Sequence, residues 1–341
     1  MSEATVGEIT QSATPVPETA AAGKPVLFMA CPLFDQAHEL LSAHFSLRFA
    51  PAAPQEVILA GLAAMTDVAA LLIPLSMPLD RRAIERLPSS LRAICTYSVG
   101  TSHIDLDAAK ERGLMVLYTP DVLSESCADT AILLMLGAGR RAVEGLGLLK
   151  SGQWPGWAPD QLLGKDLWGQ RLGIFGMGRI GQAIARRARG FDMDVHYHNR
   201  HRLPMDIENG ARYHATLAEL MAHSDYFCIA CPPTPETRGA VGDAQLAQLP
   251  EGAVVVNISR GDIINDDALV AALRGGQVAA AGLDVFAGEP DIHPDYLTLD
   301  NVFGLPHLGS ATLATRLRMA ALLRDGLLST LAGEAPLNGM G

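Results

Sequence analysis

The sequence has no apolar run long enough to cross a membrane as a helix, which needs roughly 20 mostly apolar residues. Its longest apolar runs, such as residues 68–75, are short and bounded by proline or charge, as buried strands are. Basic residues are also scarce: 26 Lys and Arg stand against 37 Asp and Glu, which gives a net charge of −11. A chain this acidic lacks the basic face that attracts nucleic acids or anionic membranes. We therefore expect neither partner.

Cysteine is rare as well. The five cysteines are odd in number and mostly lie in apolar runs, so we do not expect a disulfide framework. Cys228 and Cys231 have the spacing of a metal-binding pair, but no second pair accompanies them and they fall in a strand-like run. We interpret both as buried small hydrophobic residues, and we expect no metal site.

The first 23 residues show no hydrophobic periodicity. They lack the charged start and apolar core of a secretion signal, and they carry Glu3, Glu8 and Glu18 but no arginine, which is wrong for a mitochondrial transit peptide. We expect residues 1–23 to be a disordered or loosely packed tail and the protein to be cytoplasmic.

From residue 24 onward, short apolar runs alternate with amphipathic segments, a pattern that predicts βαβ units and parallel sheets in an α/β fold. A Gly-, Pro- and Trp-rich segment, residues 151–169, separates two halves that each look doubly wound. The predicted strands cover residues 25–30, 68–75, 91–99, 114–118, 171–175, 194–198, 226–230, 253–258, 278–284 and 301–305. The predicted helices cover residues 80–87, 106–112, 124–149, 179–189, 217–223, 266–274 and 311–331.

The clearest local signal is Gly176-Met-Gly178-Arg179-Ile180-Gly181, which follows a predicted strand and opens a predicted helix. The first glycine permits a tight turn, the second lets the backbone approach a pyrophosphate, and the third lets the helix pack on the sheet. The helix N-terminus attracts the phosphate charge. In this context the motif predicts a dinucleotide site rather than a structural turn.

The end of the next strand indicates which nicotinamide cofactor is used. An NAD enzyme usually carries Asp or Glu about 20 residues beyond the motif. This strand instead ends in His198-Asn199-Arg200-His201-Arg202, without a carboxylate. Arg200 and Arg202 could pair with a 2′-phosphate through their planar guanidiniums, and a basic surface loop is the alternative. We expect NADP(H) to be preferred, with NAD(H) as the second choice.

Three further polar residues follow predicted strands: Arg260, Glu289 and His307. Parallel sheets present ligands at their carboxyl edge. Taken singly, these residues could be a surface arginine, a turn carboxylate and a helix-capping histidine. Together, and beyond a dinucleotide motif, they suggest an active site.

From residue 91 to residue 331 the chain resembles the D-isomer-specific 2-hydroxyacid dehydrogenase family, and within it the glyoxylate/hydroxypyruvate reductases. The stretches that carry the resemblance are residues 98–101, the glycine motif, and residues 257–262, 282–290 and 307–312. The resemblance implies an oxidoreductase that reduces a small 2-keto acid to the D-2-hydroxy acid. It also implies two doubly wound domains with a cleft that closes around cofactor and acid. The expected boundaries are a dinucleotide-binding domain of residues 122–304, inserted into a substrate domain of residues 24–121 and 305–333.

The resemblance implies that Arg260, Glu289 and His307 form the active site, and elementary chemistry agrees. Reduction of a 2-keto acid needs a hydride and a proton for the nascent alkoxide, and histidine is the natural proton donor near neutral pH. Glu289 would hold the His307 ring and favour its protonated form. Arg260 would bind the substrate carboxylate and polarise the keto oxygen, and backbone amides around Val99 and Gly100 would complete the carboxylate site.

The remaining predicted contacts concern the cofactor and a second subunit. Additional cofactor contacts are predicted at Pro232, Ile258, Ser259, Asp284 and Gly309. In the similar reductases a loop with the spacing Trp154-Pro-Gly-Trp157 reaches across a dimer and borders the partner's substrate pocket. By analogy Trp157 could limit substrate size in a homodimer, and simple packing of the loop is the alternative. The expected small-molecule partner is a 2-keto or 2-hydroxy acid.

Particular residues argue for or against the rival functions. A formate dehydrogenase would be expected to carry Gln where Glu289 stands, and a phosphoglycerate dehydrogenase usually has a regulatory domain, for which no residues remain after Leu331. A reductase of 2-ketogluconate or another sugar acid stays open, because residues 75–77 would decide the pocket's shape. An NAD(H)-sensing, corepressor-like module can keep the same Arg, Glu and His, but the absence of a basic patch favours an enzyme.

Overall fold

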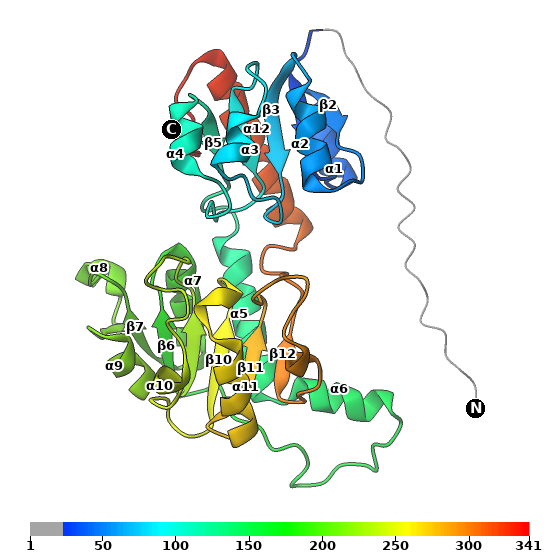
Figure 1. Cartoon of the computed structure of the whole chain (residues 1–341). Helices are drawn as coiled ribbons and strands as arrows, with labels where there is room; N and C mark the ends of the chain where they lie inside the picture. Colours follow the sequence, from blue (N-terminus) through cyan, green and yellow to red (C-terminus); the bar gives the residue numbers. More distant parts are fainter. Residues whose placement is uncertain (1–22, 341) are drawn as a thin grey trace. The chain divides into compact units, whose positions relative to one another are not determined.

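The computed structural model describes residues 23–340, so the predicted tail of residues 1–23 lies almost entirely outside the described residues. The described chain divides into two compact units (Figure 1). The smaller unit contains residues 23–97, 103–118 and 320–340, and the larger contains residues 98–102 and 119–319. Each unit is built on a mostly parallel sheet, so the predicted α/β fold is confirmed. Within residues 23–340 no helix has the length and apolar character of a membrane span.

The smaller unit holds a six-stranded sheet in the order β13-β5-β4-β3-β1-β2. Every pairing in it is parallel except that of β13 with β5. Its strands are β1 (Val26–Met29), β2 (Ser46–Phe49), β3 (Val68–Ile73), β4 (Ala93–Thr96), β5 (Met115–Leu117) and β13 (Gly339–Met340). Its helices are α1 (Asp35–Ser42), α2 (Gln55–Ala63), α3 (Arg81–Glu85) and α4 (Leu106–Glu111), and α12 (Leu313–Ala332) begins in the larger unit and ends here.

Strand β13 closes one edge of this sheet and was not predicted from the sequence. It pairs antiparallel with β5, with Gly339 opposite Leu117. The preceding residue, Asn338, is buried, and its side-chain amide donates to the carbonyl oxygens of Tyr118 at 2.9 Å and Leu322 at 3.2 Å. The buried amide therefore fastens the end of the chain to both β5 and α12.

The larger unit holds a seven-stranded sheet in the order β12-β11-β10-β9-β6-β7-β8. All its pairings are parallel. The order reverses between β6 and β9, as in dinucleotide-binding sheets, where ligands bind outside the carboxyl ends of the strands at this point. The strands are β6 (Arg171–Phe175), β7 (Asp194–His198), β8 (Arg212–Tyr213), β9 (Tyr226–Ile229), β10 (Ala253–Asn257), β11 (Val278–Leu283) and β12 (Val302–Gly304).

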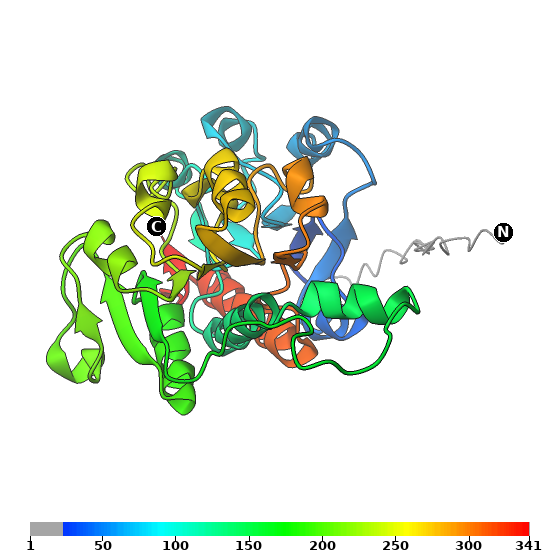
Figure 2. The ribbon, with the colours of Figure 1, turned by 90° about the horizontal axis from the view of Figure 1, so that it is seen from below.

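Helices cover both faces of this sheet (Figure 2). Helices α5 (Ser124–Gly139) and α7 (Arg179–Ala188) share one apolar core with it, and α9 (Leu217–Ala222), α10 (Asp243–Leu246) and α11 (Asp266–Gly275) share the core on the other face. Strands β6, β9, β10 and β11 are buried on both faces, which explains why they read as continuous apolar runs in the sequence. The remaining elements are α6 (Ala142–Lys150), α8 (Met205–Glu208), and the 3-10 turns Arg189–Phe191, Gly261–Ile263 and Pro294–Leu297.

The single helix predicted over residues 124–149 is wrong: α5 ends at Gly139 and α6 starts at Ala142. Arg141 between them adopts left-handed backbone angles, with φ of 54°. The carbonyl oxygen of Gly139 accepts a hydrogen bond from the backbone N–H of Lys165 at 2.7 Å, so it is not free for a further helical turn. A segment far along the chain thus ends the helix.

The division between the units falls later than the predicted domain boundary at Gly304. Residues 305–319 pack with the larger unit. The cause is local, because the backbone amides that follow His307 bond to Asp284 of the same unit. The domain limits expected from the sequence otherwise stay a prediction.

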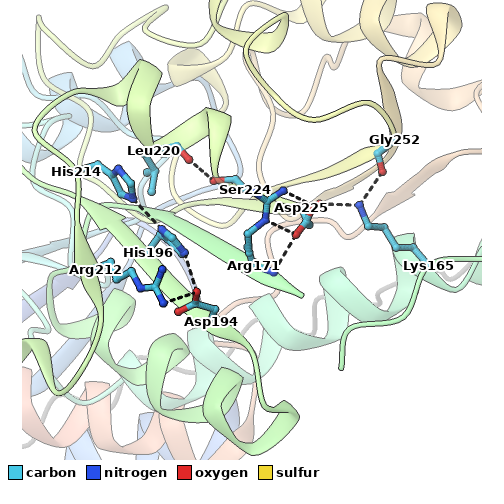
Figure 3. Close-up of polar contacts among 10 residues, drawn as sticks. All are labelled: Lys165, Arg171, Asp194, His196, Arg212, His214, Leu220, Ser224, Asp225 and Gly252. Atoms are coloured by element: carbon cyan, nitrogen blue, oxygen red, sulfur yellow. Dashed lines mark hydrogen bonds and ion pairs between the residues drawn. The ribbon is translucent and has the colours of Figure 1, made fainter. Parts of the chain in front are cut away.

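His196, His214 and His223 form a stack of rings beside β7 and β8, and Figure 3 shows the first two. His196 is 2% exposed and contacts His214 through ring nitrogens 2.8 Å apart, and its other ring nitrogen faces Asp194 at 3.2 Å. The rings of His196 and His214 lie 5.1 Å apart, and that of His223 lies 4.9 Å from His214. Burial lowers the pKa of His196 and of His214, and for His214 the neighbouring histidines lower the pKa further.

This histidine stack predicts acid sensitivity. The other charged groups facing it are Arg212 and Glu219, with Asp194 opposing the shift at His196. Unfolded histidines take up protons below about pH 6.5, whereas the folded pair resists protonation, so stability is lost as the pH falls below that value. We expect a loss of roughly 1 kcal/mol between pH 7.5 and 5.5. Urea unfolding at both pH values measures it.

The matched variants for this prediction are His214→Gln in the stack and His44→Gln on the surface of the smaller unit. His214→Gln should flatten the pH dependence of the urea midpoint, because one of the groups that resists protonation is gone. His44→Gln should leave it as in the wild type. An identical pH dependence in both variants would contradict a role of the stack.

Candidate active site

The glycine loop between β6 and α7 has the geometry of a phosphate cradle. Gly176 has φ of 104°, and a Cβ there would lie 2.4 Å from the backbone nitrogen of Cys231. A Cβ on Gly181 would lie 2.2 Å from the carbonyl oxygen of Gly176, so this position admits only glycine. A Cβ on Gly178, by contrast, would meet nothing within 4 Å. The loop therefore leaves open space at the N-terminus of a ten-residue helix, which fits a dinucleotide pyrophosphate.

The carboxyl end of β7 adjoins this loop. The His198 carbonyl oxygen accepts the Gly176 N–H at 3.0 Å, and Asn199 Oδ1 accepts the Met177 N–H at 2.7 Å. Asn199 thus occupies the place where NAD enzymes carry a carboxylate for the ribose, and its oxygen is engaged by the glycine loop. Arg200 is exposed and makes no hydrogen bond or ion pair with any residue in the described part of the chain.

The other predicted cofactor residues lie at the same edge of the sheet. Arg179 is exposed and forms an ion pair with Asp121, and Ile180, the second residue of α7, packs against the core. Pro232 follows β9, while Ile258 and Ser259 follow β10. The Ser259 hydroxyl donates to the carbonyl oxygen of Cys231 and so ties the two strand ends together. Cys228 and Cys231 are buried free thiols, as the sequence indicated.

The three predicted active-site residues follow three neighbouring strands. Arg260 follows β10, Glu289 follows β11 and His307 follows β12, which lie side by side in the sheet order. His307 Nδ1 lies 2.8 Å from Glu289 Oε2, and Glu289 Oε1 accepts the Phe286 N–H at 2.7 Å. Because Nδ1 is engaged by the carboxylate, Nε2 is the ring atom left to donate a proton.

The charge of Glu289 is set by opposing effects. Burial raises its pKa, but the hydrogen bonds from His307 and Phe286, with the charges of His307 and Arg260, outweigh burial and lower it on balance. Glu289 is therefore an anion at neutral pH, held by its partners rather than by solvent. Its side chain and that of His307 are 34% and 36% exposed, so the pair remains accessible to a substrate.

Asp284 fixes the backbone that carries His307. The aspartate is 1% exposed, and its carboxylate accepts the N–H groups of Leu308 at 2.6 Å and Gly309 at 2.8 Å. The His307 N–H donates to the Asp284 carbonyl oxygen at 2.9 Å. His307 has φ of 55°, a left-handed conformation uncommon for histidine. Burial raises the pKa of Asp284, and the two amides oppose this.

Arg260 is held between two loops. Its Nη1 donates to the Ser259 carbonyl oxygen at 2.6 Å, and the next residue must be glycine, because a Cβ on Gly261 would lie 1.9 Å from the backbone of Phe286. Burial lowers the pKa of Arg260, against the raising effect of the Glu289 and Asp262 carboxylates. The guanidinium remains a cation and is only partly solvated, which strengthens its attraction for a substrate carboxylate.

The absence of a side chain at Gly100 leaves space for the Arg260 guanidinium, which the predicted carboxylate site needs in this position. A Cβ at Gly100 would lie 2.4 Å from Arg260 Nη2. We expect Gly100→Ala to displace the guanidinium and lower kcat/KM for the keto acid by roughly 10- to 100-fold. The loss should appear mainly in KM, and the melting temperature should change little, because the end of a flexible side chain can move. Steady-state kinetics and thermal unfolding measure both.

Gly61→Ala on α2 is the matched control, since a Cβ at Gly61 would meet nothing within 4 Å. It should leave both kcat and KM within twofold of the wild type. Unchanged kinetics in Gly100→Ala would mean that the position of Arg260 does not matter for substrate binding.

The sequence did not reveal the positioning roles of three residues, Asp284, Asn257 and Glu208. Asp284 was predicted as a cofactor contact and not as the clamp on the His307 loop. Asn257, the last residue of β10, donates through Nδ2 to the Arg260 carbonyl oxygen at 2.8 Å and accepts the Ser259 N–H at 3.0 Å. Glu208 bonds to Arg202. A buried polar residue at a strand end was the available signal for the first two.

Comparison with known proteins agrees with this geometry. Residues 132–309 match the NAD-binding domain of the D-isomer-specific 2-hydroxyacid dehydrogenases. The glycerate dehydrogenase of Hyphomicrobium methylovorum is 44% identical over 274 residues, 80% of this chain and 85% of that protein. The glyoxylate reductase of Thermococcus gammatolerans is 38% identical over 320 residues, 92% of this chain and 95% of that protein.

A solved structure extends the comparison to three dimensions. The NADPH-dependent glyoxylate/hydroxypyruvate reductase of Sinorhizobium meliloti, solved in complex with NADP and malonate, superposes with a TM-score of 0.83. It is 32% identical, and the match covers 93% of this chain and 97% of that chain. The chain belongs to the D-isomer-specific 2-hydroxyacid dehydrogenase family. It is an oxidoreductase whose larger unit is a nicotinamide-dinucleotide-binding domain.

Proposed function

We propose that the protein reduces glyoxylate and hydroxypyruvate to the corresponding 2-hydroxy acids, with D-glycerate as the product from hydroxypyruvate. The observation that carries this proposal is the His307–Glu289 pair, placed with Arg260 at the ends of three adjacent strands. Relatives named glycerate dehydrogenase and glyoxylate reductase support the choice of small keto acids.

The residues of the site provide substrate binding and proton transfer. Arg260, with backbone amides near Val99 and Gly100, binds the substrate carboxylate and polarises the keto oxygen. A bound reduced nicotinamide supplies the hydride. His307 donates the proton on Nε2 to the oxygen as it becomes an alkoxide, and Glu289 holds the ring through Nδ1.

We further propose that NADP(H) is preferred over NAD(H). The support is the missing carboxylate at Asn199 and the free guanidinium of Arg200 beside the glycine loop. The relative from Sinorhizobium meliloti, described as NADPH-dependent and solved with NADP, agrees with this choice. A 2′-phosphate would give the Arg200 guanidinium the ion pair that it lacks within the described residues.

The test is the initial rate of NADPH and NADH oxidation with glyoxylate, hydroxypyruvate, pyruvate and 2-ketogluconate in parallel. Faster turnover of the first two acids with NADPH is the expected result. A preference for 2-ketogluconate would mean that the proposed substrate is wrong, while the proposed reduction of a 2-keto acid would stand. Tight binding of NADPH without turnover of any acid would indicate a nucleotide-sensing module instead of an enzyme.

We also propose a homodimer that uses α6 and the loop after it. Helix α6 is apolar yet buries none of its residues, and it extends away from the sheet (Figure 1). Leu146 and Leu149 on it are 52% and 60% exposed, and Trp154 and Trp157 in the loop are 51% and 81% exposed. A cavity of about 580 Å³ lies beside α6 in the larger unit. Apolar surface of this kind is typical of subunit contacts, and Trp157 would border the partner's substrate pocket.

The dimer predicts a specific response to charge on α6. Leu149→Glu should produce monomers in sedimentation equilibrium, because a carboxylate would be buried without a partner. Val57→Glu is the matched control, since Val57 is also 55% exposed but lies on α2 of the smaller unit. It should remain dimeric. A Leu149→Glu variant with the mass of the wild-type dimer would place the interface elsewhere.

A further inference from the structure

Of the two arginines expected to bind the 2′-phosphate, one is already engaged by a carboxylate. Arg202 Nε lies 2.8 Å from Glu208 Oε1, and Arg202 Nη2 lies 2.9 Å from Glu208 Oε2. This is the bidentate geometry in which a guanidinium also binds a phosphate. Since Glu208 occupies that edge of Arg202, a phosphate would have to displace a carboxylate to use it.

The Glu208 carboxylate is itself held firmly. Its side chain is 6% exposed, and Oε1 accepts the Tyr197 hydroxyl at 2.6 Å. Arg202 and Tyr197 lower the pKa of Glu208 to about 2, so it stays charged wherever the enzyme works. The Tyr197 hydroxyl oxygen accepts the Leu203 N–H at 2.9 Å. The network thus joins β7, the following loop and α8.

Arg200, two residues before Arg202, is in the opposite situation. Its side chain is exposed, and no residue from 23 to 340 forms an ion pair with it. Its charge contributes to lowering the pKa of Glu236, after the Thr234 side chain and the backbone. It directly follows Asn199, whose side chain is bonded to the glycine loop. Arg200 therefore lies beside the cofactor site with a guanidinium that makes no ion pair within the described residues.

We propose that Glu208 sets the coenzyme preference by committing Arg202 to the protein, so that Arg200 alone binds the 2′-phosphate. This inference rests on the proposed preference for NADP(H). Glu208 is a positioning residue, because it acts through Arg202 and touches neither substrate nor cofactor. The Arg202–Glu208 pair adds no net charge at the site, and the attraction for the phosphate is that of a single guanidinium.

The dissociation constants of NADPH and NADH, measured by the fluorescence of the bound nicotinamide, test this division without any keto acid. The readout is selectivity, the NADH constant divided by the NADPH constant. Arg200→Gln should reduce selectivity at least tenfold. The double variant Arg202→Gln/Glu208→Gln removes both charges together and leaves no buried charge unpaired. It should keep selectivity within twofold of the wild type.

Glu208→Gln alone should change the selectivity for NADPH in the opposite direction to Arg200→Gln. It removes the charge that neutralises Arg202, so selectivity for NADPH should rise at least threefold. Asp206→Asn is the matched control: Asp206 lies on the same helix, is exposed, and makes no ion pair within the described chain. Its selectivity should stay within twofold of the wild type. A purely structural role of Glu208 would weaken both coenzymes equally and leave selectivity unchanged.

Two results would overturn the inference. One is a loss of selectivity in the double variant as large as that in Arg200→Gln, which would make Arg202 a phosphate ligand. The other is an unchanged or reduced selectivity in Glu208→Gln. If Glu208→Gln does not fold, the double variant and Arg200→Gln decide the question. A wild-type protein that binds NADH more tightly than NADPH would instead refute the proposed coenzyme preference, and Glu208→Gln would still report on Arg202.

Discussion

Replacement of His307 by alanine is expected to lower turnover of glyoxylate by roughly 10²–10⁴-fold, the contribution typical of a general acid. The imidazole is the group whose Nε2 can deliver the proton, because Nδ1 is bonded to Glu289 at 2.8 Å. Binding of NADPH should remain within about twofold of the wild type, since the glycine loop is untouched. Steady-state kinetics and nicotinamide fluorescence measure the two effects separately.

His293→Ala is the matched control for this variant. His293 lies four residues after Glu289 in the sequence, but its ring faces Asp267 at 3.2 Å, outside the active site. Turnover should remain within twofold. Turnover in His307→Ala close to that of the wild type would remove His307 from the mechanism, and equal losses in both variants would indicate a structural cause.

Replacement of Arg260 by lysine is expected to lower kcat/KM by roughly 10²–10³-fold, even though the positive charge is kept. A lysine ammonium is a single point charge and cannot bind a carboxylate through two parallel hydrogen bonds. The guanidinium of Arg260 is also held in place by the Ser259 carbonyl oxygen at 2.6 Å. The loss should be shared between KM and kcat, because Arg260 both binds the carboxylate and polarises the keto oxygen.

Arg274→Lys is the matched control for the replacement of an arginine by a lysine outside the active site. Arg274 lies on α11 and forms a surface ion pair with Asp295 at 2.9 Å. Pairs of this kind contribute little, so kcat/KM should be unchanged within twofold. A fully active Arg260→Lys variant would show that a point charge is sufficient and would weaken the bidentate arrangement proposed for the substrate carboxylate.

The sequence was most informative where strands are buried on both faces. The predicted strands at residues 171–175 and 194–198 coincide with β6 and β7. The first is a short apolar run, and the glycine motif follows it directly. The strand ends then place Arg260, Glu289 and His307 at one edge of the sheet, because parallel neighbours share their direction.

Local patterns do not predict α1, β2 and α2, which lie within residues 31–63. Strand β2 is only four residues long and contains Ser46 and Arg48, so it lacks an apolar run. Helix α2 reads Gln-Glu-Val-Ile-Leu-Ala-Gly-Leu-Ala, with apolar residues on most of its surface and no clear periodicity. Such segments take their structure from the sheet on which they pack.

Contacts between residues distant in sequence, or between a residue and a later helix, could not be read from local patterns. The break after α5 depends on Lys165, which bonds to the Gly139 carbonyl oxygen. The sequence shows Arg202 as a free cation, whereas in the fold a carboxylate six residues later neutralises it. Local patterns identify which groups are present, and tertiary packing decides which of them remain free.

The strand β13 has a consequence for biosynthesis. The larger unit is almost continuous, whereas the smaller unit takes residues from both ends of the chain. During translation, domains fold as they emerge. The larger unit can therefore fold before β13 has been synthesised, at a time when one edge of β5 is still unpaired. Until then the outer edge of β5 presents unpaired backbone groups, which another chain can use to add a strand. The nascent protein is therefore open to aggregation at this edge until β13 has been synthesised.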